Sequence, residues 1–350
     1  GLQALQAVLQ GLPCNVYGQW HMPLVDPLLM ADLPQANAIP LPAALRVSEQ
    51  LPGARQYAAL YLRWHVPSPL RQRLQGVLEQ ALAPLQERCE RASVQLQFTA
   101  AGEYWQLRCA GLPAAVLRAV TQALALIVTP PARCWLPCTT PPVALIPIRA
   151  LLKQLPDAVL GTPPPTGPAC TLEQQQLDKL WQHTRWHGLA AGFDDSALNA
   201  LGTALQHCPG HGSLPSPLPT WANRRWQHAE VPGSEHAMLL FCPLPAASEA
   251  SGRLLAQLLQ GPVYQRLRVE LQLGYAVFST FRQIEGVGGL LFGVQSPHTQ
   301  QAQILDHLLT LLNKGVTLDP GTQQALASQF DEPAMANADV AEWAWQTHLA

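Results

Sequence analysis

Residues 261–296 have the sequence GPVYQRLRVELQLGYAVFSTFRQIEGVGGLLFGVQS, and this stretch decides the fold of the 350-residue chain. Its first part has apolar residues at helical spacing, and the rest consists of two strand-like runs rich in Val, Phe, Leu and Gly. The dipeptide Glu285-Gly286 separates these runs and predicts a tight turn between them. The stretch therefore predicts a helix followed by an antiparallel hairpin.

The segments on either side extend this pattern to a complete unit. A strand-like run precedes the helix at residues 236–245, and helical spacing follows the hairpin at residues 299–313. The same order of strand, helix, strand, strand and helix is predicted about 180 residues earlier, from Tyr57 to Ile127. An order that repeats over a whole unit indicates an internal duplication of a domain.

Hairpins combined with long helices predict the α+β class, with two similar domains that each have a mostly antiparallel sheet and helices packed on one face. The 33 prolines are densest from Thr129 to Pro168, a composition typical of a linker. We therefore divide the chain into a connector or lead-in from a preceding half (1–52), a first domain (53–150), a proline-rich linker (151–174) and a second domain (175–350). Between the two repeated units, a helix, a strand (WHGLAAGF) and another helix are also predicted.

The composition excludes several classes of protein. With 48% hydrophobic and 13% charged residues, the chain has the composition of a folded protein and not of a disordered one. The net charge of -2, without runs of like charge, argues against a nucleic-acid partner. No apolar run is long enough to cross a membrane and no basic leader is present, so we expect a cytoplasmic protein, with the periplasm as the alternative.

Two groups of potential metal ligands have suggestive spacing, but each is incomplete. His183 and His187 lie four residues apart without a carboxylate between them, and ordinary surface histidines are the alternative. His207, Cys208 and His211 surround a Pro-Gly turn without a fourth ligand, and a loop that ends a helix is the alternative. Phosphate-binding glycine loops and serine-hydrolase elbows are absent. We therefore assign no metal-binding or cofactor-binding residues to this chain.

Residues 261–296 also resemble a segment of the insulinase/pitrilysin zinc peptidases. In that segment an Arg closes a helix, a Q-L-G-Y turn opens a strand, and a glycine-containing hairpin leads to a strand that ends in Q-S. The matching positions are Arg268, Gln272, Leu273, Gly274, Tyr275, Gly286, Gly289, Gln295 and Ser296. The resemblance implies the C-terminal half of a peptidase whose four α+β domains form two halves around a chamber. The proline-rich composition is most similar to the bacterial branch of the family that acts in pyrroloquinoline quinone (PQQ) biosynthesis.

The zinc motif of this family, H-x-x-E-H, occurs nowhere in the chain. The resemblance therefore implies that Zn²⁺ is held by an N-terminal half, in the same polypeptide or in a separate subunit, and that this chain alone does not hydrolyse peptides. The expected partners are this zinc-bearing half and a peptide substrate, for which we expect the PQQ precursor, without nucleic acid or membrane. A catalytically inactive partner subunit or a peptide-binding module of the same fold is the alternative function.

The resemblance also implies a role for Arg268 and Tyr275 in the chamber. A guanidinium and a phenol are strong hydrogen-bond donors, so they can hold the scissile carbonyl of a peptide and stabilise the oxyanion formed during hydrolysis. Gly274 is expected to let the backbone pass closely at this point. The alternative is that Arg268 extends along the surface and Tyr275 packs within the hairpin.

Overall fold

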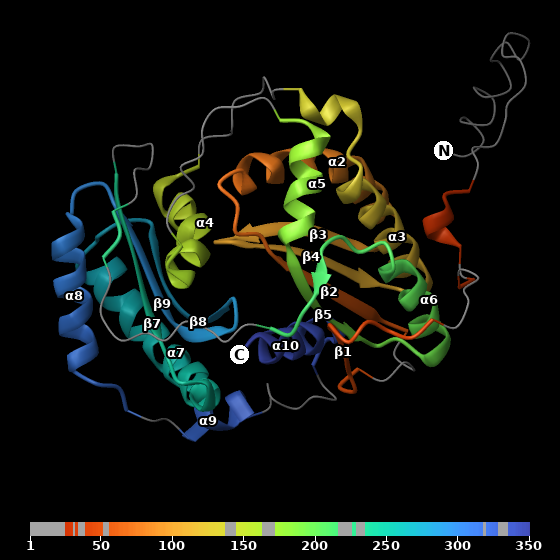
Figure 1. Cartoon of the computed structure of the whole chain (residues 1–350). Helices are drawn as coiled ribbons and strands as arrows, with labels where there is room; N and C mark the ends of the chain where they lie inside the picture. The colour runs from red at the N-terminus through yellow and green to blue at the C-terminus, as the bar shows by residue number, and fades with distance from the viewer. Residues whose placement is uncertain are drawn as a thin grey trace, which may run out of the picture.

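A computed structural model describes residues 25–30, 32–33, 39–51, 56–136, 145–162, 172–215, 226–228, 235–317, 320–327 and 335–350. Within these ranges the strands form two sheets, which lie side by side with their helices (Figure 1). Most strand pairs are antiparallel. The predicted α+β class with two similar, mostly antiparallel sheets is confirmed, but helices cover both faces of the first sheet and not one face only.

The first sheet has the strand order β1-β5-β2-β4-β3, and β6 also pairs with β5. β1 and β6 run parallel to β5, whereas the other pairs are antiparallel. The strands are β1 (Leu45–Ser48), β2 (Ala58–His65), β3 (Gln95–Ala101), β4 (Tyr104–Gly111), β5 (Arg185–Ala191) and β6 (His211–Gly212).

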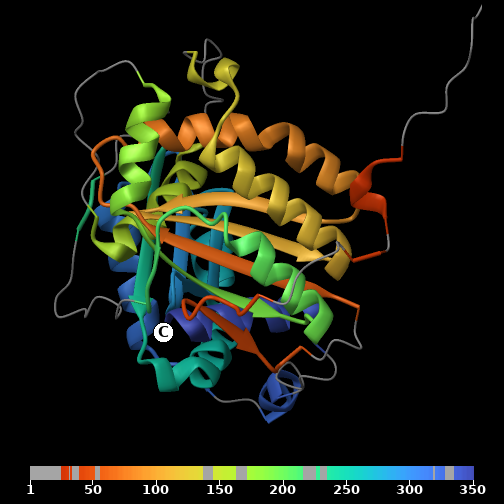
Figure 2. The ribbon, with the colours of Figure 1, turned by 45° about the vertical axis from the view of Figure 1, so that its right-hand side comes forward.

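The central strand β2 is buried on both faces, because helices cover both sides of the first sheet. On one face, Leu60, Leu62 and Trp64 join the main hydrophobic core with four helices, and the two longest of them lie above the sheet in Figure 2. These helices are α2 (Arg71–Arg91), α3 (Pro113–Val128), α5 (Gln174–His183) and α6 (Asp195–Leu205). Two short 3₁₀ turns pack against these helices. They are η1 (Pro27–Leu29), which contacts α3, and η3 (Ala132–Trp135), which contacts α2.

The opposite face of the first sheet is covered by the last helix of the chain, α10 (Asn337–Leu349). Trp345 of α10 is completely buried and stacks on Tyr61 with 5.0 Å between ring centroids. Its indole N–H also donates a hydrogen bond to the Gln106 amide oxygen at 2.9 Å. The end of the second half of the chain therefore completes the core of the first half.

The second sheet is smaller and has the order β7-β9-β8, with antiparallel pairs throughout. Its strands and helices follow the predicted order. They are β7 (His236–Pro243), η4 (Ala246–Ser248), α7 (Glu249–Val263), the π-helical segment η5 (Tyr264–Glu270), β8 (Ala276–Ile284), β9 (Val287–Ser296), α8 (Gln301–Asn313) and α9 (Pro320–Ala327). The predicted turn is confirmed, because Glu285 and Gly286 connect β8 to β9 with φ angles of 52° and 86°.

The division of the chain at the predicted boundaries stays a prediction, but individual elements differ from it. β1 comes from the expected lead-in and β5 from the expected second domain, yet both belong to the first sheet. β5 joins β2 because Gly188 lets the strands approach, and a Cβ at this position would lie 2.6 Å from the Tyr61 carbonyl oxygen. Residues 147–160, partly in the expected linker, form α4 (Pro147–Leu160).

α4 connects the two sheets. It packs on the second sheet, on the side that faces the first sheet (Figure 1). Near its C-terminal end, Asp157 accepts a hydrogen bond from the backbone N–H of Gly102 in the β3–β4 turn. At its beginning, the backbone N–H of Ile148 donates to the side-chain oxygen of Gln295 in β9 at 3.0 Å. A proline at the first helical turn removes no hydrogen bond, which explains how this proline-rich stretch can begin a helix.

Candidate functional site

The two predicted site residues lie where a helix leads into the hairpin of the second sheet. Pro262 lies inside α7 and lacks the N–H that an α-helix would use, and the chain continues as a π-helix from Tyr264 to Glu270. Arg268 lies in the last turn of this π-helix, and Tyr275 directly precedes β8. The turn between them includes Gln272, whose φ angle is 48°. A π-helix is uncommon and occurs frequently at functional sites.

Gly274 makes this turn possible. A Cβ at this position would collide with the carbonyl oxygen of Gln295 in the neighbouring strand β9. The close passage of the backbone expected at Gly274 is therefore confirmed. β9 therefore limits the path of the turn. This path fixes the backbone position of Tyr275, the residue that follows Gly274.

Arg268 and Tyr275 line the same open hollow on the surface, which has a volume of about 540 Å³ and is also lined by Val269, Gln272 and Gly274. The guanidinium of Arg268 is partly buried and donates from Nη1 to the carbonyl oxygen of Gly274 at 2.6 Å. The side chain of Tyr275 is 53% exposed. Neither residue lies in the hydrophobic core, so both donors are accessible from the hollow. Their role in substrate binding stays a prediction.

The hydroxyl of Tyr275 has two partners from other strands. It donates to Oε2 of Glu235, just before β7, at 3.1 Å, and accepts from Nε2 of Gln295 in β9 at 2.6 Å. Nε2 of Gln295 also donates to Oε2 of Glu235. Partial loss of hydration, together with the hydrogen bond and the charge of Glu235, raises the pKa of the Tyr275 phenol above its usual value. The phenol therefore keeps its proton at neutral pH and can act as a donor.

The possible metal ligands considered above do not meet. His183 ends α5, where its Nδ1 lies 2.9 Å from the carbonyl oxygen of Lys179, whereas His187 lies in β5 and packs against α10. The ring Nε2 of His211 lies 3.1 Å from the carbonyl oxygen of Gln182. Within the described part of the chain, no group of three His, Cys, Asp or Glu side chains is placed to hold a metal ion.

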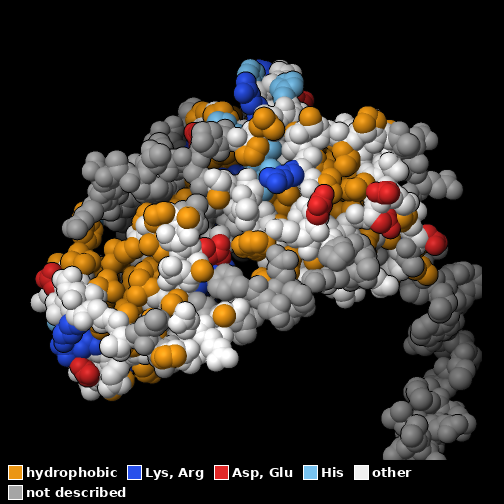
Figure 3. All heavy atoms as spheres, turned by 90° about the horizontal axis from the view of Figure 1, so that it is seen from below, with side chains coloured by type: hydrophobic (Ala, Val, Ile, Leu, Met, Phe, Trp, Pro, Cys, Tyr) orange, Lys and Arg blue, Asp and Glu red, His pale blue; other side chains and the backbone are white. Residues whose placement is uncertain are grey.

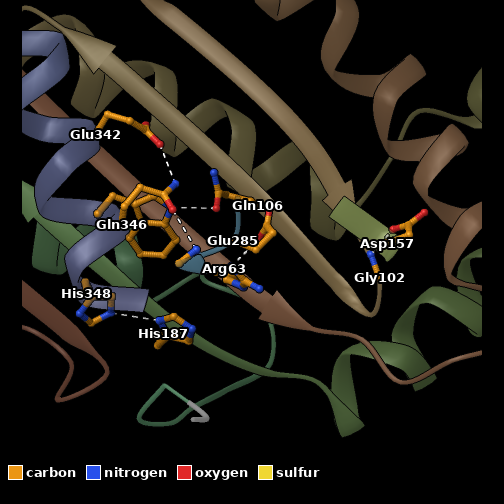
Figure 4. A network of polar contacts seen from close by, with 11 residues as sticks. Arg63, Gly102, Gln106, Asp157, His187, Glu285, Glu342, Gln346 and His348 are labelled. Carbon is orange, nitrogen blue, oxygen red and sulfur yellow. Dashed lines mark hydrogen bonds and ion pairs between the residues drawn. The ribbon is translucent and has the colours of Figure 1, made fainter. Parts of the chain in front are cut away.

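A second polar cluster lies between the two sheets, at the tip of the β8–β9 hairpin (Figure 4). Arg63 of β2 is buried and forms an ion pair with Glu285 of the hairpin turn at 2.5 Å. The next residue, Gly286, donates its backbone N–H to Oε1 of Gln346 in α10 at 2.9 Å. Burial is the main cause that lowers the pKa of Arg63 and raises that of Glu285, and the partner's charge opposes the shift in each case. This cluster attaches the hairpin to the first sheet.

Two histidines lie beside this cluster. Nδ1 of His187 in β5 lies 3.1 Å from Nε2 of His348 in α10 (Figure 4). Burial lowers the pKa of His187 to about 3, with further contributions from His348 and Arg63. Burial and the charge of Arg46 lower the pKa of His348 to about 4. Both rings are therefore neutral at pH 7, as expected for imidazoles in a helix–sheet contact.

Many apolar side chains lie on one surface of the part of the molecule that contains the second sheet. Seen from below, hydrophobic side chains gather over the part of the molecule that contains the second sheet and its helices (Figure 3). Tyr264, Val269 and Tyr275 belong to the large hydrophobic side chains that are exposed. In the described residues, no helix is both long and apolar enough to span a membrane.

Two family models match the chain in the regions of the two sheets. The model described as PQQ synthase PqqF, C-terminal lobe domain 3, matches residues 57–190, and PQQ synthase PqqF-like, C-terminal lobe domain 4, matches residues 254–345. Together they cover well over half of the chain. The chain belongs to the PqqF C-terminal-lobe family. The domain 3 match extends through most of β5, in agreement with the position of this strand in the first sheet.

Curated relatives agree with this family. Coenzyme PQQ synthesis protein F from Pseudomonas putida is 79% identical over all 350 residues of this chain, which correspond to 46% of the relative. The protein of the same name from Pseudomonas protegens is 39% identical over 88% of this chain and 38% of its own length. The chain thus spans less than half the length of these curated relatives.

Solved structures show the same fold at low sequence identity. The structure of pitrilysin has a TM-score of 0.55 and 18% identity, covering 93% of this chain and 40% of pitrilysin. A structure from Pseudomonas fluorescens described as a peptidase M16 inactive domain has a TM-score of 0.53 and 15% identity, covering 89% of this chain and 87% of that one. Together with the family models and the curated relatives, these structures confirm the resemblance to insulinase/pitrilysin peptidases and to their C-terminal half.

Proposed function

We propose that this chain is the substrate-positioning C-terminal half of a zinc metalloendopeptidase, and that Arg268 and Tyr275 bind the carbonyl group of the peptide that is cleaved. The observation that carries the proposal is the joint position of both donors on one open hollow, outside the hydrophobic core. Such a hollow is accessible to a peptide held between this half and another.

The chemistry of the two groups fits this role. Arg268 contributes a guanidinium with several N–H donors, and Tyr275 keeps its phenolic proton because its pKa is raised. Both can donate hydrogen bonds to a carbonyl oxygen, and these bonds become stronger as negative charge develops on that oxygen. Arg268 and Tyr275 therefore bind and orient the peptide carbonyl group and stabilise the negative charge that develops on its oxygen. They transfer no group themselves.

The described residues do not fit a zinc site, because no three potential ligands come together. We propose that the Zn²⁺ ion is held by the N-terminal half of the full protein, and we expect no peptide hydrolysis by this chain alone. The N-terminal half is then the principal partner of this chain. The substrate that we propose is the precursor peptide of PQQ, because the relatives with 79% and 39% identity are both named for coenzyme PQQ synthesis.

A second candidate function is a non-catalytic module that only binds peptides. One observation favours it: the single proton of the Tyr275 hydroxyl is donated to Glu235 in this structure and not directed into the hollow. A module of this kind would still need Arg268 and the hollow, but the Tyr275 proton would contribute nothing to turnover.

The test uses the full-length protein, containing both halves, and an internally quenched peptide with the sequence of the PQQ precursor. Arg268→Ala and Tyr275→Phe are expected to lower kcat by about 100-fold each, as for the loss of an oxyanion donor. Arg266→Ala and Tyr264→Phe are matched controls from the same π-helix, and they should leave kcat unchanged because both side chains are solvent-exposed and lie outside the hollow.

The outcome separates the two functions. If Tyr275→Phe retains full turnover while Arg268→Ala weakens peptide binding, the peptide-binding module is correct. If neither variant differs from the controls, the hollow has no part in the reaction and the proposed function is wrong.

A further inference from the structure

Gln295 is an unusual residue for its position. It lies near the end of β9, in a strand that otherwise consists mainly of Val, Gly, Leu and Phe, and it is only 1% exposed. A buried amide costs free energy unless its donors and acceptor find partners. Here both ends of the amide are bonded, to groups from three different segments of the chain.

These partners fix the orientation of the amide. The backbone N–H of Ile148, at the first turn of α4, can only donate, so the oxygen of Gln295 must face it, at 3.0 Å. The NH₂ group then faces the opposite direction, toward the hydroxyl of Tyr275 at 2.6 Å and toward the carboxylate of Glu235. A carboxylate at position 295 could not donate a hydrogen bond to the Tyr275 hydroxyl or to the Glu235 carboxylate unless it were protonated.

The hydroxyl of Tyr275 is thereby held on its acceptor side. It accepts from Gln295 and donates its one proton to Glu235. The bond from Gln295 uses a lone pair and not the proton, so it can persist when the proton turns from Glu235 to another acceptor in the hollow. Glu235 would then still receive a hydrogen bond from Gln295.

We propose that Gln295 is a positioning residue for Tyr275: its amide, oriented by the first turn of α4, holds the phenol oxygen at the hollow while the phenol proton alternates between Glu235 and the peptide carbonyl. This inference rests on the proposed function, because it presumes that Tyr275 donates to substrate. It goes beyond that function by placing the control of Tyr275 in a buried side chain that never touches the peptide.

The test is a double-mutant cycle in the full-length protein with the same quenched peptide. Gln295→Met removes both ends of the amide, and Gln295→Glu keeps an acceptor for Ile148 but loses the NH₂ donor. Both variants should lower kcat by about 10- to 100-fold with a smaller change in KM, the scale expected for a misplaced reacting group. In the Tyr275→Phe background the same changes should lower kcat by less than about twofold, because the group being positioned is absent.

Two further measurements distinguish positioning from a structural effect. Activity of Gln295→Glu should recover partly as the pH is lowered, because a protonated carboxyl can donate to Tyr275 in place of the amide. Ser296→Ala is the matched control: Ser296 is also buried at the end of β9, but its hydroxyl accepts only from the backbone N–H groups of His298 and Thr299. This variant should keep its kcat at every pH.

The possible outcomes distinguish the positioning role of Gln295 from the proposed function on which it rests. If Tyr275→Phe has no effect on turnover, both are wrong. If Tyr275→Phe lowers kcat but the Gln295 variants match Ser296→Ala, only the positioning role is wrong. If the Gln295 variants lower kcat equally with and without the Tyr275 hydroxyl, Gln295 acts through the fold and the inference is again overturned. If Gln295→Met does not fold, Gln295→Glu decides by the same criteria.

Discussion

The first strands of the two repeated units, β2 and β7, occupy corresponding places in the predicted order but differ in burial. In the first sheet, β2 is buried along seven of its eight residues, whereas in the second sheet only Met238 of β7 is fully buried. β2 pairs with strands on both sides, and helices cover both of its faces. β7 pairs only with β9 within the described residues. The first strand of the first unit is therefore enclosed, whereas the first strand of the second unit is only partly buried.

The closed sheet is completed by elements from outside its own repeat. β5 adds a strand beside β2, and α10 covers the face that would otherwise be open. Among the described residues, the second sheet has no added strand equivalent to β5, and the domain that contains it carries Arg268, Tyr275 and Gln295. We infer that contacts through α10, α4 and the tip of the β8–β9 hairpin hold the second domain in place on the first. The second domain contains the candidate site residues Arg268 and Tyr275.

The largest expected effect concerns the helix that closes the first sheet. Trp345→Ala should lower the free energy of unfolding by about 3–5 kcal/mol, because it empties a fully buried site stacked on Tyr61 and removes the bond to Gln106. Thermal and urea unfolding would measure this loss. Trp343→Ala, on the same helix but only partly buried, is the control and should cost much less. Equal losses would show that α10 contributes little to closing the sheet.

The next effect concerns the attachment of the second sheet to the first. Glu285→Gln should destabilise the protein by about 3 kcal/mol, because the buried Arg63 guanidinium loses its charged partner. Arg253→Gln is the control, since its ion pair with Glu249 lies within one helix and is more exposed. Urea unfolding followed by circular dichroism would compare the two. A loss at Glu285 no larger than at Arg253 would mean that the hairpin tip is not anchored by this pair.

Much of each domain could be predicted from the sequence because its elements depend on local patterns. The hairpin turn at Glu285-Gly286 and the order of strands and helices in both domains follow from spacing within a few residues. The position of α10 could not be predicted this way. His187 and His348, for example, are 161 residues apart, and nothing in the helical spacing near His348 indicates which sheet it covers.

The candidate site shows the same limit. Arg268 and Tyr275 were identified because a motif places them close together in sequence. Gln295 stood in the same motif, but its role depends on contacts with Ile148, 147 residues away, and with Glu235, 60 residues away. A buried polar residue in an apolar strand was the available indication for Gln295. Glu235 had no such indication, because one acidic residue before a strand is ordinary.

A moderate effect is expected at the turn that shapes the site. Gly274→Ala should destabilise the protein by about 1–3 kcal/mol and lower activity, because the added methyl group collides with the Gln295 carbonyl and forces β8 and β9 apart. Gly261→Ala in α7 is the matched control. Nothing lies within 4 Å of a Cβ there, so Ala should stabilise the helix by about 0.5–1 kcal/mol. Unfolding curves that shift in the same direction for both variants would contradict a close passage at Gly274.

The smallest effect is the pH dependence of the contact between α10 and β5. The pKa values of His187 and His348 are lowered to about 3 and 4, whereas both groups titrate near 6.5 in the unfolded chain. Between these values the unfolded chain binds more protons than the folded one, so stability falls as the pH drops below about 6.5 toward 4.

Because His348 is partly exposed, solvent screening reduces its share, and we expect a loss of about 1–2 kcal/mol at pH 5.5 relative to pH 7.5. Thermal unfolding at both pH values would measure it, with His348→Gln and the exposed His183→Gln compared with the parent. His348→Gln should reduce the dependence without abolishing it, because His187 keeps a lowered pKa through burial, and His183→Gln should leave it unchanged. The same slope in all three proteins would assign the acid sensitivity to the carboxylates and would remove the histidine pair from the account of how the first sheet is closed.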